Sequence, residues 1–327
     1  MKAIVYTQYG SPDVLHLQEL EKPAPLEDEV LLKVQSASLN AYDWHMLTAD
    51  IFLVRLVAGL LKPNNTLIGA DIAGRVEAVG RNVTQFQPGD EVFGQARHAV
   101  GGCAEYVCAR ENALALKPAN CTFDEAAAVP MAGFTALQGL RDQGQIQAGQ
   151  KVLINGAAGG VGTFAVQIAK VFGAEVSAVC STRNLEMARS IGADHVIDYT
   201  QEDFTKNGQR YDLIFAANGY HSIFDYRRAL TPAGVYVMAG GAVPQMFQAL
   251  TLGPWLTKSG GQKMGALSAK VSQSDLVFLK GLLETGKIKS VIDRRYPLSE
   301  VPEALRYLGA GHARGKVVIT VGSDTPA

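Results

Sequence analysis

The chain has 327 residues, of which 47% are hydrophobic and 19% are charged, and its formal net charge is −1. This composition is typical of a soluble globular protein, and the length allows two domains with substantial cores. There is no basic excess to neutralise phosphates, so we do not expect nucleic-acid binding.

The N-terminal ten residues lack the apolar segment of a secretory signal. The most apolar run, residues 51–61, is interrupted by Arg55 and is too short to span a bilayer. The four cysteines form no CxxC pair and no disulfide framework; they are Cys103, Cys108, Cys121 and Cys180. We therefore expect a cytoplasmic protein with reduced cysteines and no membrane partner.

The first 120 residues combine short apolar segments with frequent turn sequences, such as Gly-Ser-Pro-Asp at 10–13 and Gln-Pro-Gly-Asp at 87–90. The segments between the turns are rich in Val, Ile and aromatic residues, which favours strands at residues 2–6, 29–37, 72–79, 91–93 and 104–108. This spacing predicts a small, partly open barrel, with helix somewhere in residues 41–61.

From about residue 122 the pattern changes to strands that alternate with helices. A helix is expected to begin near residue 123, capped by Thr122 or Asp124. Further strands are predicted at residues 152–154, 175–181, 195–199, 211–217, 235–240 and 263–268, and helices at 161–172, 185–191 and 222–230. Such alternation is typical of a parallel, doubly wound sheet.

After a predicted helix at residues 273–284, the chain ends in a predicted strand at residues 316–321. This end is more similar to the β-rich front half than to the middle of the chain. We therefore predict that one α/β domain, residues 122–269, is inserted in a discontinuous domain made of residues 1–121 and 270–327.

A glycine-rich turn at residues 156–162 lies between a buried strand and an amphipathic helix. In this setting, free backbone N–H groups and the positive end of the helix dipole form a pyrophosphate site. The usual fingerprint has glycine at its first, third and sixth positions, where this chain has Ala157, Gly159 and Gly162. The placement of the turn favours dinucleotide binding despite the replaced first glycine.

The end of the second strand distinguishes the two nicotinamide cofactors, because an acidic residue there binds the ribose 2′-hydroxyl. Here the segment reads Ser181-Thr182-Arg183-Asn184 and has no carboxylate. Its hydroxyls and its guanidinium suit a 2′-phosphate, and Tyr199 adds a hydroxyl at the same rim. We therefore predict NADPH as the cofactor.

Several motifs in order along the chain resemble the medium-chain dehydrogenase/reductase superfamily, in its zinc-free quinone oxidoreductase and alkenal/enone reductase branch. They lie at residues 38–43, 69–76, 79–80, 89–92, 125–130, 133–136, 157–162, 192–199 and 311–316. The resemblance implies an α/β fold, with a Rossmann doubly wound parallel sheet inserted in a discontinuous GroES-like β-rich catalytic domain. It also implies an active site in the cleft between the domains, and a homodimer.

Zinc alcohol dehydrogenases are the main alternative within the superfamily. They carry a Gly-His-Glu sequence where this chain has Gly69-Ala70-Asp71, and Asn40 stands near the position of their first catalytic cysteine. Without a Lewis acid, alcohol oxidation loses the means to stabilise an alkoxide, whereas conjugation already delocalises charge in a quinone or an enone. We expect no metal site.

The resemblance also implies roles for single residues. It places Asn40 and Thr135 beside the nicotinamide, with Gly240, Gly241 and Leu267 on the other side. The pyrophosphate is expected to meet Ala158, Gly159, Gly160 and Val161.

Near the C-terminus, Arg314 and Lys316 either close on the cofactor or lie in a solvated turn, and both interpretations stay open. Tyr42 is our candidate for the hydrogen-bond donor or proton relay to the enolate left by hydride transfer, with solvent as an equal source of the proton. Asp43 is expected to anchor a local turn, and His45 to be an ordinary packed or surface histidine.

These observations predict a zinc-independent, NADPH-dependent oxidoreductase that acts on a quinone or on the β-carbon of an α,β-unsaturated carbonyl. Two alternatives remain. One is an enoyl reductase that acts in trans on carrier-bound thioesters. The other is a cofactor-binding protein with a structural or regulatory role and little turnover.

Overall fold

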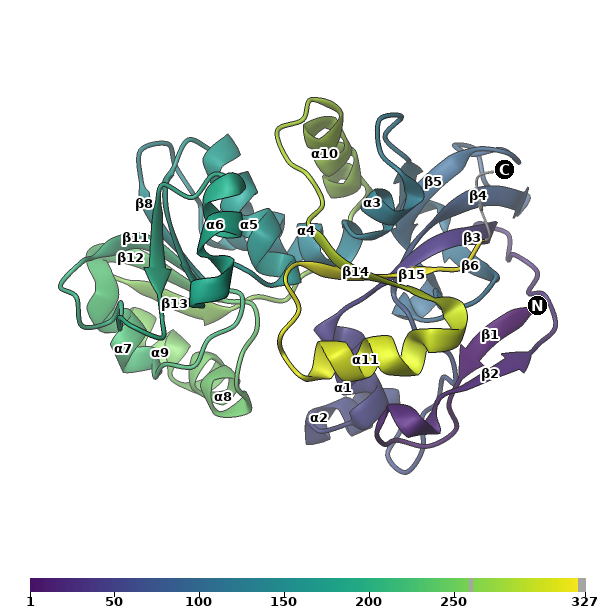
Figure 1. The fold of residues 1–327 in the computed structure, drawn as a ribbon, viewed down its shortest axis with the longest axis horizontal. Helices are drawn as coiled ribbons and strands as arrows, with labels where there is room; N and C mark the ends of the chain where they lie inside the picture. The colour runs from purple at the N-terminus through teal and green to yellow at the C-terminus, as the bar shows by residue number, and fades with distance from the viewer. Residues whose placement is uncertain (259–260, 323–327) are drawn as a thin grey trace. The chain divides into compact units, whose positions relative to one another are not determined.

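The computed structural model describes residues 1–258 and 261–322, and the chain divides into two compact units. The β-rich unit comprises residues 1–131 and the segment from residue 271 onward, and the α/β unit comprises residues 132–270. Each unit has its own sheet (Figure 1).

The longest strand of the β-rich unit, β3 (Glu29–Leu39), lies at the centre of a seven-stranded sheet with the order β14-β15-β3-β4-β5-β7, and β6 also pairs with β3. The other strands are β4 (Asp71–Val79), β5 (Glu91–Gln95), β6 (Tyr106–Arg110), β7 (Leu114–Leu116), β14 (Ile292–Pro297) and β15 (Lys316–Thr320). A separate hairpin joins β1 (Lys2–Val5) to β2 (His16–Glu19). Strand β6 pairs with the first half of β3. Because β15 pairs with the last residues of β3, this strand joins the N-terminal and C-terminal segments of the unit.

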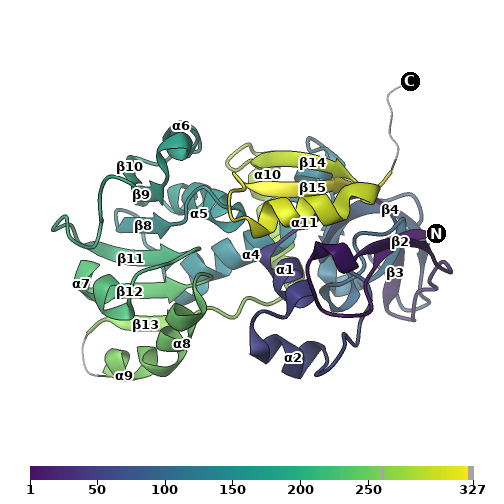
Figure 2. The ribbon, with the colours of Figure 1, turned by 60° about the horizontal axis from the view of Figure 1, so that its bottom comes forward.

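The helices of the β-rich unit are α1 (Ala41–Thr48), α2 (Phe52–Ala58), α3 (Phe123–Ala127), α10 (Gln273–Glu284) and α11 (Val301–Gly309). Thr122 is the N-cap of α3, and its hydroxyl accepts a hydrogen bond from the backbone N–H of Glu125 at 3.2 Å. Of the two caps expected for this helix, the structure therefore uses Thr122. Helices α1 and α11 lie side by side, although most of the chain separates them in sequence (Figures 1 and 2).

One hydrophobic core of the β-rich unit is built from both ends of the chain. Ile4, Leu39 and Leu47 from the N-terminal part pack in one cluster with residues from the C-terminal part. The C-terminal members are Leu298, Val301, Ala304, Leu305, Val317 and Ile319. Residues from both ends of the chain therefore share this core.

The α/β unit contains six strands in the order β10-β9-β8-β11-β12-β13, and every neighbouring pair is parallel (Figure 2). They are β8 (Lys151–Asn155), β9 (Glu175–Cys180), β10 (His195–Asp198), β11 (Tyr211–Ala216), β12 (Leu230–Met238) and β13 (Lys263–Ala266). The helices are α5 (Gly160–Val171), α6 (Leu185–Ser190), α7 (Ile223–Ala229), α8 (Val243–Thr251) and α9 (Gly253–Lys258). Helix α4 (Pro130–Gln138) enters the unit from the boundary. The doubly wound parallel sheet is confirmed.

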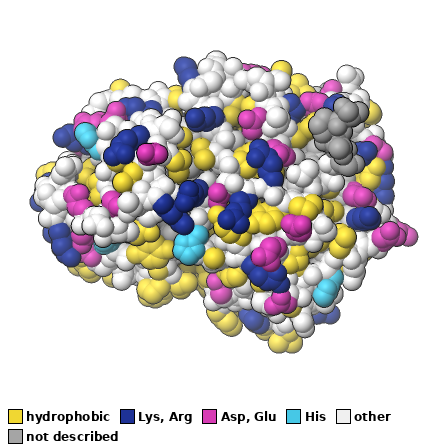
Figure 3. All heavy atoms as spheres, in the orientation of Figure 1, with side chains coloured by type: hydrophobic (Ala, Val, Ile, Leu, Met, Phe, Trp, Pro, Cys, Tyr) yellow, Lys and Arg dark blue, Asp and Glu magenta, His cyan; other side chains and the backbone are white. Residues whose placement is uncertain are grey.

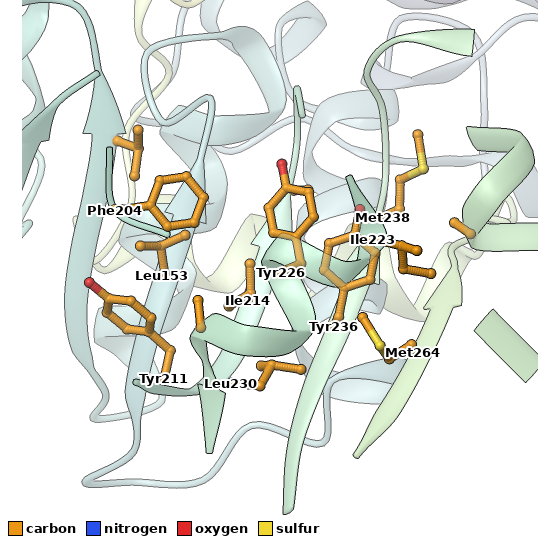
Figure 4. Packing of buried hydrophobic residues seen from close by; sticks show 14 of the residues in the cluster. Leu153, Phe204, Tyr211, Ile214, Ile223, Tyr226, Leu230, Tyr236, Met238 and Met264 are labelled. Carbon is orange, nitrogen blue, oxygen red and sulfur yellow. The ribbon is translucent and has the colours of Figure 1, made fainter. Parts of the chain in front are cut away.

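Aromatic side chains fill the core on one side of this sheet. Tyr226 of α7 stacks on Tyr236 of β12, with ring centroids 4.6 Å apart and an interplanar angle of 28°. Leu153, Ile214 and Met264 lie in the same cluster (Figure 4). Buried apolar side chains on neighbouring strands stabilise the sheet because they are removed from water together.

The first boundary between the units differs from the predicted one. The prediction gave residues 122–131 to the α/β domain, whereas the structure groups them with the β-rich unit. The reason is that α3 packs against β3, β4 and β5. The second boundary, after residue 270, lies one residue beyond the predicted end of the α/β domain.

On the surface, acidic and basic side chains are intermixed over the visible face, in keeping with the net charge of −1 (Figure 3). Among the residues that the structure describes, none of the helices is both long and apolar enough to cross a bilayer.

Candidate active site

The glycine-rich turn connects β8 to α5 in the α/β unit, as predicted. Gly156 has a φ of +82°, and a Cβ atom on Gly162 would lie 2.1 Å from the carbonyl oxygen of Gly156. Both positions therefore require glycine. Ala157, by contrast, is fully buried, so the side chain that replaces the first glycine of the fingerprint is turned into the core.

Gly159 is the N-cap of α5 and has open space where a side chain would stand, since a Cβ atom there would meet only the oxygen of Gly156 at 3.6 Å. The first-turn N–H groups of a helix have no acceptor within the helix. In α5 these groups belong to Gly160, Val161 and Gly162, and Ala158 lies just before them with 8% of its surface exposed. The turn can therefore receive an anion at a glycine-lined helix N-terminus.

Ser181 follows β9 directly, and the exposed Arg183 lies in the short turn that begins there. Strands β9 and β10 pair with Cys180 opposite Asp198, which brings Tyr199 to the same rim, where 61% of it is exposed. The Ser181 hydroxyl accepts a hydrogen bond from Asn184 at 3.1 Å. The three residues predicted to surround a 2′-phosphate therefore all come after the carboxyl ends of β9 and β10, which are adjacent in the sheet.

Thr182 is the other hydroxyl residue of the segment predicted to bind the 2′-phosphate, but its hydroxyl is hydrogen-bonded within the protein. Its hydroxyl donates to the carboxylate of Asp198 at 2.5 Å. The hydrogen bond from Thr182, and after it that from Thr200, lowers the pKa of Asp198. Asp198 is thus a negative charge at the rim that the sequence analysis did not consider.

Gly240, Gly241 and Leu267 follow the carboxyl ends of β12 and β13, at the edge of the sheet where dinucleotides bind in this fold. Gly241 has a φ of +136°, and a Cβ atom there would lie 2.5 Å from the oxygen of Gly219. The N–H of Leu267 donates to the carbonyl of Met238 at 2.7 Å. Thr135 is half-buried on α4.

In the β-rich unit, strand register brings together three polar side chains. Ser38 of β3 pairs with Asp71 of β4, and Leu39 of β3 pairs with Val317 of β15. Asn40, which follows β3, therefore lies between Asp71 on one side and Lys316 on the other. Asp71 is fully buried and Lys316 is 2% exposed.

The carboxylate of Asp71 is surrounded by donors. Its Oδ1 accepts from Gln95 at 3.2 Å and from the backbone N–H of Met131 at 3.1 Å, and its Oδ2 accepts from Asn40 Nδ2 at 3.0 Å. Lys316 Nζ lies 3.6 Å from Oδ2. Burial raises the pKa of Asp71, while the Lys316 ammonium and the hydrogen bonds oppose that shift. Gln95 carries no sequence motif that would predict this contact with Asp71.

Asp43 anchors the start of α1, as predicted. Its Oδ2 accepts from the backbone N–H of Asn40 at 2.8 Å, and its Oδ1 accepts from that of Gly69 at 3.1 Å. Burial raises the pKa of Asp43 to about 7. The carboxyl thus ties the first turn of α1 to the segment before β4.

Tyr42 is half-buried in the same turn of α1. Burial and, to a smaller extent, the charge of Asp43 raise the pKa of its phenol. A phenol is protonated at neutral pH even at its ordinary pKa, so the hydroxyl can donate a hydrogen bond. His45 is paired through Nδ1 with Asp50 at 2.8 Å.

The two C-terminal candidates differ in their surroundings. Arg314 is exposed, and its backbone N–H donates to Asp293 at 2.8 Å. Lys316 is not in a solvated turn, because its ammonium donates to Asn40 Oδ1 and, at 3.3 Å, to the carbonyl of Leu39. The solvated-turn interpretation is therefore wrong for Lys316. Among the described residues, no group of three or more His, Cys, Asp or Glu side chains is placed to hold a metal ion.

Two family models match the chain. The model described as "Alcohol dehydrogenase GroES-like domain" covers residues 26–137, and the one described as "Zinc-binding dehydrogenase" covers residues 191–319. Together they cover parts of both units.

Three curated relatives are similar over 98% of the chain. A 2-methylene-furan-3-one reductase from Solanum lycopersicum is 38% identical, with 79% of that protein covered. An NADPH-dependent alkenal/one oxidoreductase, chloroplastic, from Arabidopsis thaliana is 36% identical, also with 79% covered. A quinone-oxidoreductase homolog, chloroplastic, from Spinacia oleracea is 34% identical, with 98% covered.

Solved structures agree with these relatives. The quinone oxidoreductase from Coxiella burnetii is 30% identical and superimposes with a TM-score of 0.87, covering 98% of this chain and 99% of that one. The CurK enoyl reductase is 27% identical with a TM-score of 0.86 and the same coverage.

These names correct one expectation. The absence of a recognisable secretory segment and the reduced cysteines led us to expect a cytoplasmic protein, but the relatives from Arabidopsis thaliana and Spinacia oleracea are named chloroplastic. A mouse relative that is 33% identical is named mitochondrial. The cytoplasmic expectation is therefore wrong: cysteine usage and a missing secretory segment do not distinguish the cytosol from these organelles. With both halves of the chain matched and relatives similar along its whole length, the chain belongs to the medium-chain dehydrogenase/reductase superfamily, in its quinone oxidoreductase and alkenal/enone reductase branch.

Proposed function

We propose that this oxidoreductase is a zinc-independent, NADPH-dependent reductase that transfers a hydride to a quinone or to the β-carbon of an α,β-unsaturated carbonyl. The observation that carries the zinc-independent part is the engagement of Asp71. Both of its oxygens accept hydrogen bonds from protein donors, and a buried ammonium lies 3.6 Å away. A carboxylate held in this way has its lone pairs committed and its charge compensated.

The fit to NADPH rests on the α/β unit. Gly156 and Gly162 leave no room for side chains, so a pyrophosphate can approach the first-turn N–H groups of α5. Ser181, Arg183 and Tyr199 supply two hydroxyls and a guanidinium for the 2′-phosphate. The relative from Arabidopsis thaliana that is named NADPH-dependent supports the same cofactor.

When bound, NADPH supplies the hydride. Hydride arrival at the β-carbon of an enone leaves an enolate, whose oxygen needs a hydrogen-bond donor and whose α-carbon then needs a proton. We assign the donor role to Tyr42, because its phenol is half-buried in the first turn of α1, two residues after Asn40. The proton comes from Tyr42 or from solvent, and the product is the saturated carbonyl.

The role that we assign to Asn40 is to orient the nicotinamide. Its Oδ1 has two lone pairs, of which the Lys316 ammonium takes one. The other can accept a hydrogen bond from a bound group. We assign this interaction to the nicotinamide side of the cofactor, as the family resemblance implies for this residue.

The test is NADPH oxidation with a quinone, an acyclic enone and a carrier-linked enoyl thioester, each measured before and after chelator treatment. We expect turnover with the quinone or the enone that chelation leaves unchanged. Turnover only with the thioester would favour the trans-acting enoyl reductase, an activity suggested by the likeness to CurK. NADPH binding without turnover on any acceptor would favour a structural or regulatory protein and contradict the proposal.

We also propose a homodimer, which the family resemblance implies. In the described part of the α/β unit, β13 is the last strand of the sheet, and α9 packs against it, where the N–H of Met264 donates to the hydroxyl of Thr257 at 2.9 Å. Next to it, α8 exposes Val243, Phe247 and Leu250 on one face. Light scattering on the purified protein decides between a monomer and a dimer.

A further inference from the structure

The buried ion pair of the β-rich unit has no role in the proposed reduction so far. Lys316 and Asp71 begin β15 and β4, the two strands that flank the end of β3, and both are almost fully buried. Burying two charges costs more free energy than their attraction returns unless further hydrogen bonds satisfy them. Here such hydrogen bonds are present, and Asn40 takes part in one with each of the two charges.

Both charges contact the same amide. Lys316 donates to Asn40 Oδ1, and Asp71 Oδ2 accepts from Asn40 Nδ2 at 3.0 Å. An ammonium can only donate and a carboxylate can only accept. Rotation of the amide by 180° would set its N–H groups against the ammonium and its oxygen against the carboxylate. The ion pair thus permits one orientation of the Asn40 side chain.

We propose that Lys316 and Asp71 are positioning residues that fix the orientation of the Asn40 amide for the reduction. This inference rests on the proposed function, in which Asn40 faces the nicotinamide. Asn40 is half-buried, and both ends of its amide are held by the ion pair. Neither Lys316 nor Asp71 needs to touch substrate or cofactor.

The assignment explains why both charges are present. A neutral residue at position 316 would leave Asp71 uncompensated, and the carboxyl would respond by taking up a proton and becoming a donor itself. The distinction between donor and acceptor on the two sides of Asn40 would then disappear. Loss of both charges together removes the buried charge but weakens the restraint on the amide.

The test compares Lys316→Met with the charge-neutral pair Asp71→Asn/Lys316→Met. Lys117→Met is the matched control. Lys117 belongs to the same unit, its side chain is 7% exposed, it lies 3.2 Å from Glu91, and it donates to two backbone carbonyls. Turnover with NADPH and the acceptor that the wild type uses is measured, together with the melting temperature of each variant.

We expect Lys316→Met to lower kcat at least tenfold, and Lys117→Met to change it less than twofold. The double variant is expected to recover at least threefold over Lys316→Met. A Lys316→Met enzyme with kcat within twofold of wild type would overturn the inference, as would equal losses in the Lys117→Met control. If Lys316→Met does not fold, the same comparison is made in the Asp71→Asn background, where loss of Lys316 should lower kcat at least twofold, and a loss no larger than that caused by Lys117→Met would overturn the inference.

A second readout does not depend on turnover. The side-chain amide signals of Asn40 in ¹⁵N–¹H spectra are assigned by their disappearance in Asn40→Ser. In the wild type we expect the Nδ2 proton bound to Asp71 to exchange slowly with water, and in Lys316→Met to exchange at least tenfold faster. Unchanged exchange would overturn the inference. A wild type that reduces no acceptor would refute the proposed function alone, and the amide signals would still decide whether the ion pair orients Asn40.

Discussion

At the scale of single residues, the buried carboxyl of Asp43 makes the stability of the folded protein depend on pH. Both oxygens accept backbone N–H groups, yet burial dominates and raises the pKa to about 7, with the negative charge of Asp71 acting in the same direction. The Lys316 ammonium and the two hydrogen bonds act against this shift. The folded protein therefore holds a proton on Asp43 at pH values where an unfolded aspartate has lost it.

The raised pKa of Asp43 makes the free energy of unfolding fall as pH rises. Between pH 4 and pH 7 the unfolded chain releases the Asp43 proton while the folded chain keeps it, so this carboxyl lowers the stability of the fold as pH rises, and its effect levels off above pH 7. Relative to Asp43→Asn, the wild type should lose about 3 kcal/mol of unfolding free energy between pH 5 and pH 8. Urea unfolding of both proteins across this range provides the measurement. Parallel stability curves would contradict the raised pKa.

The residues of the site were predictable to different degrees. The role of Asp43 follows from its place three residues after Asn40, the spacing of a capping interaction. Lys316 was predicted to be near the site, but not its burial, because it meets Asn40 from 276 residues away through the pairing of β15 with β3. Gln95 gave no signal, since a polar residue at a strand end usually faces solvent.

At the scale of elements, the segments found from sequence are the ones with strong local patterns. Helix α5 has apolar residues at helical spacing and ends at Val171. Gly173 follows it with a φ of +78°, and its N–H donates to the carbonyl of Lys170. By contrast, β14 contains Asp293, Arg294 and Arg295, and this charged composition predicts a loop and not a strand. It is a strand because β15 pairs with it.

Helix α11 was also missed, because it has only nine residues and carries Pro302 in its first turn. Proline is compatible with that position, but the segment is too short for its pattern to be decisive. The helix exists because its apolar side packs into the core beside α1. Tertiary contacts therefore decide both β14 and α11.

The contact between α1 and α11 requires glycine at its centre. A Cβ atom on Gly309 would lie 2.2 Å from a ring carbon of Trp44, a rigid side chain of α1. Gly309→Ala should therefore lower the unfolding free energy by about 1–3 kcal/mol through overpacking. It should also lower kcat, since α1 begins directly after Asn40 and carries Tyr42.

Gly281→Ala on α10 is the matched control, because a Cβ atom there would meet nothing within 4 Å. Alanine is the better helix former, so this variant should gain up to about 1 kcal/mol. Denaturant unfolding of both variants gives the comparison. Equal effects of the two substitutions would show that Trp44 adjusts without cost.

At the scale of the whole molecule, the order of the chain determines which parts can fold alone. The α/β unit is one continuous segment whose six strands pair only with one another in the described residues. The β-rich unit is discontinuous, and the core that contains Leu39 is completed by Leu305, Val317 and Ile319 from the C-terminal segment. The β-rich character of the C-terminal end, residues 316–321, predicted this discontinuity, and the family resemblance implied the same layout.

Fragments of the chain test this organisation and the proposed domains. Residues 132–270 expressed alone should unfold cooperatively in urea and bind NADPH, because the glycine turn and the Ser181–Arg183 rim both lie within them. Residues 1–131 alone should not fold, since β3 would lose β15 and the core would lose its C-terminal side chains. Adding residues 271–327 in trans should restore a cooperative transition to the 1–131 fragment. A cooperatively folded 1–131 fragment, or a 132–270 fragment that stays unfolded, would contradict the division into these two units.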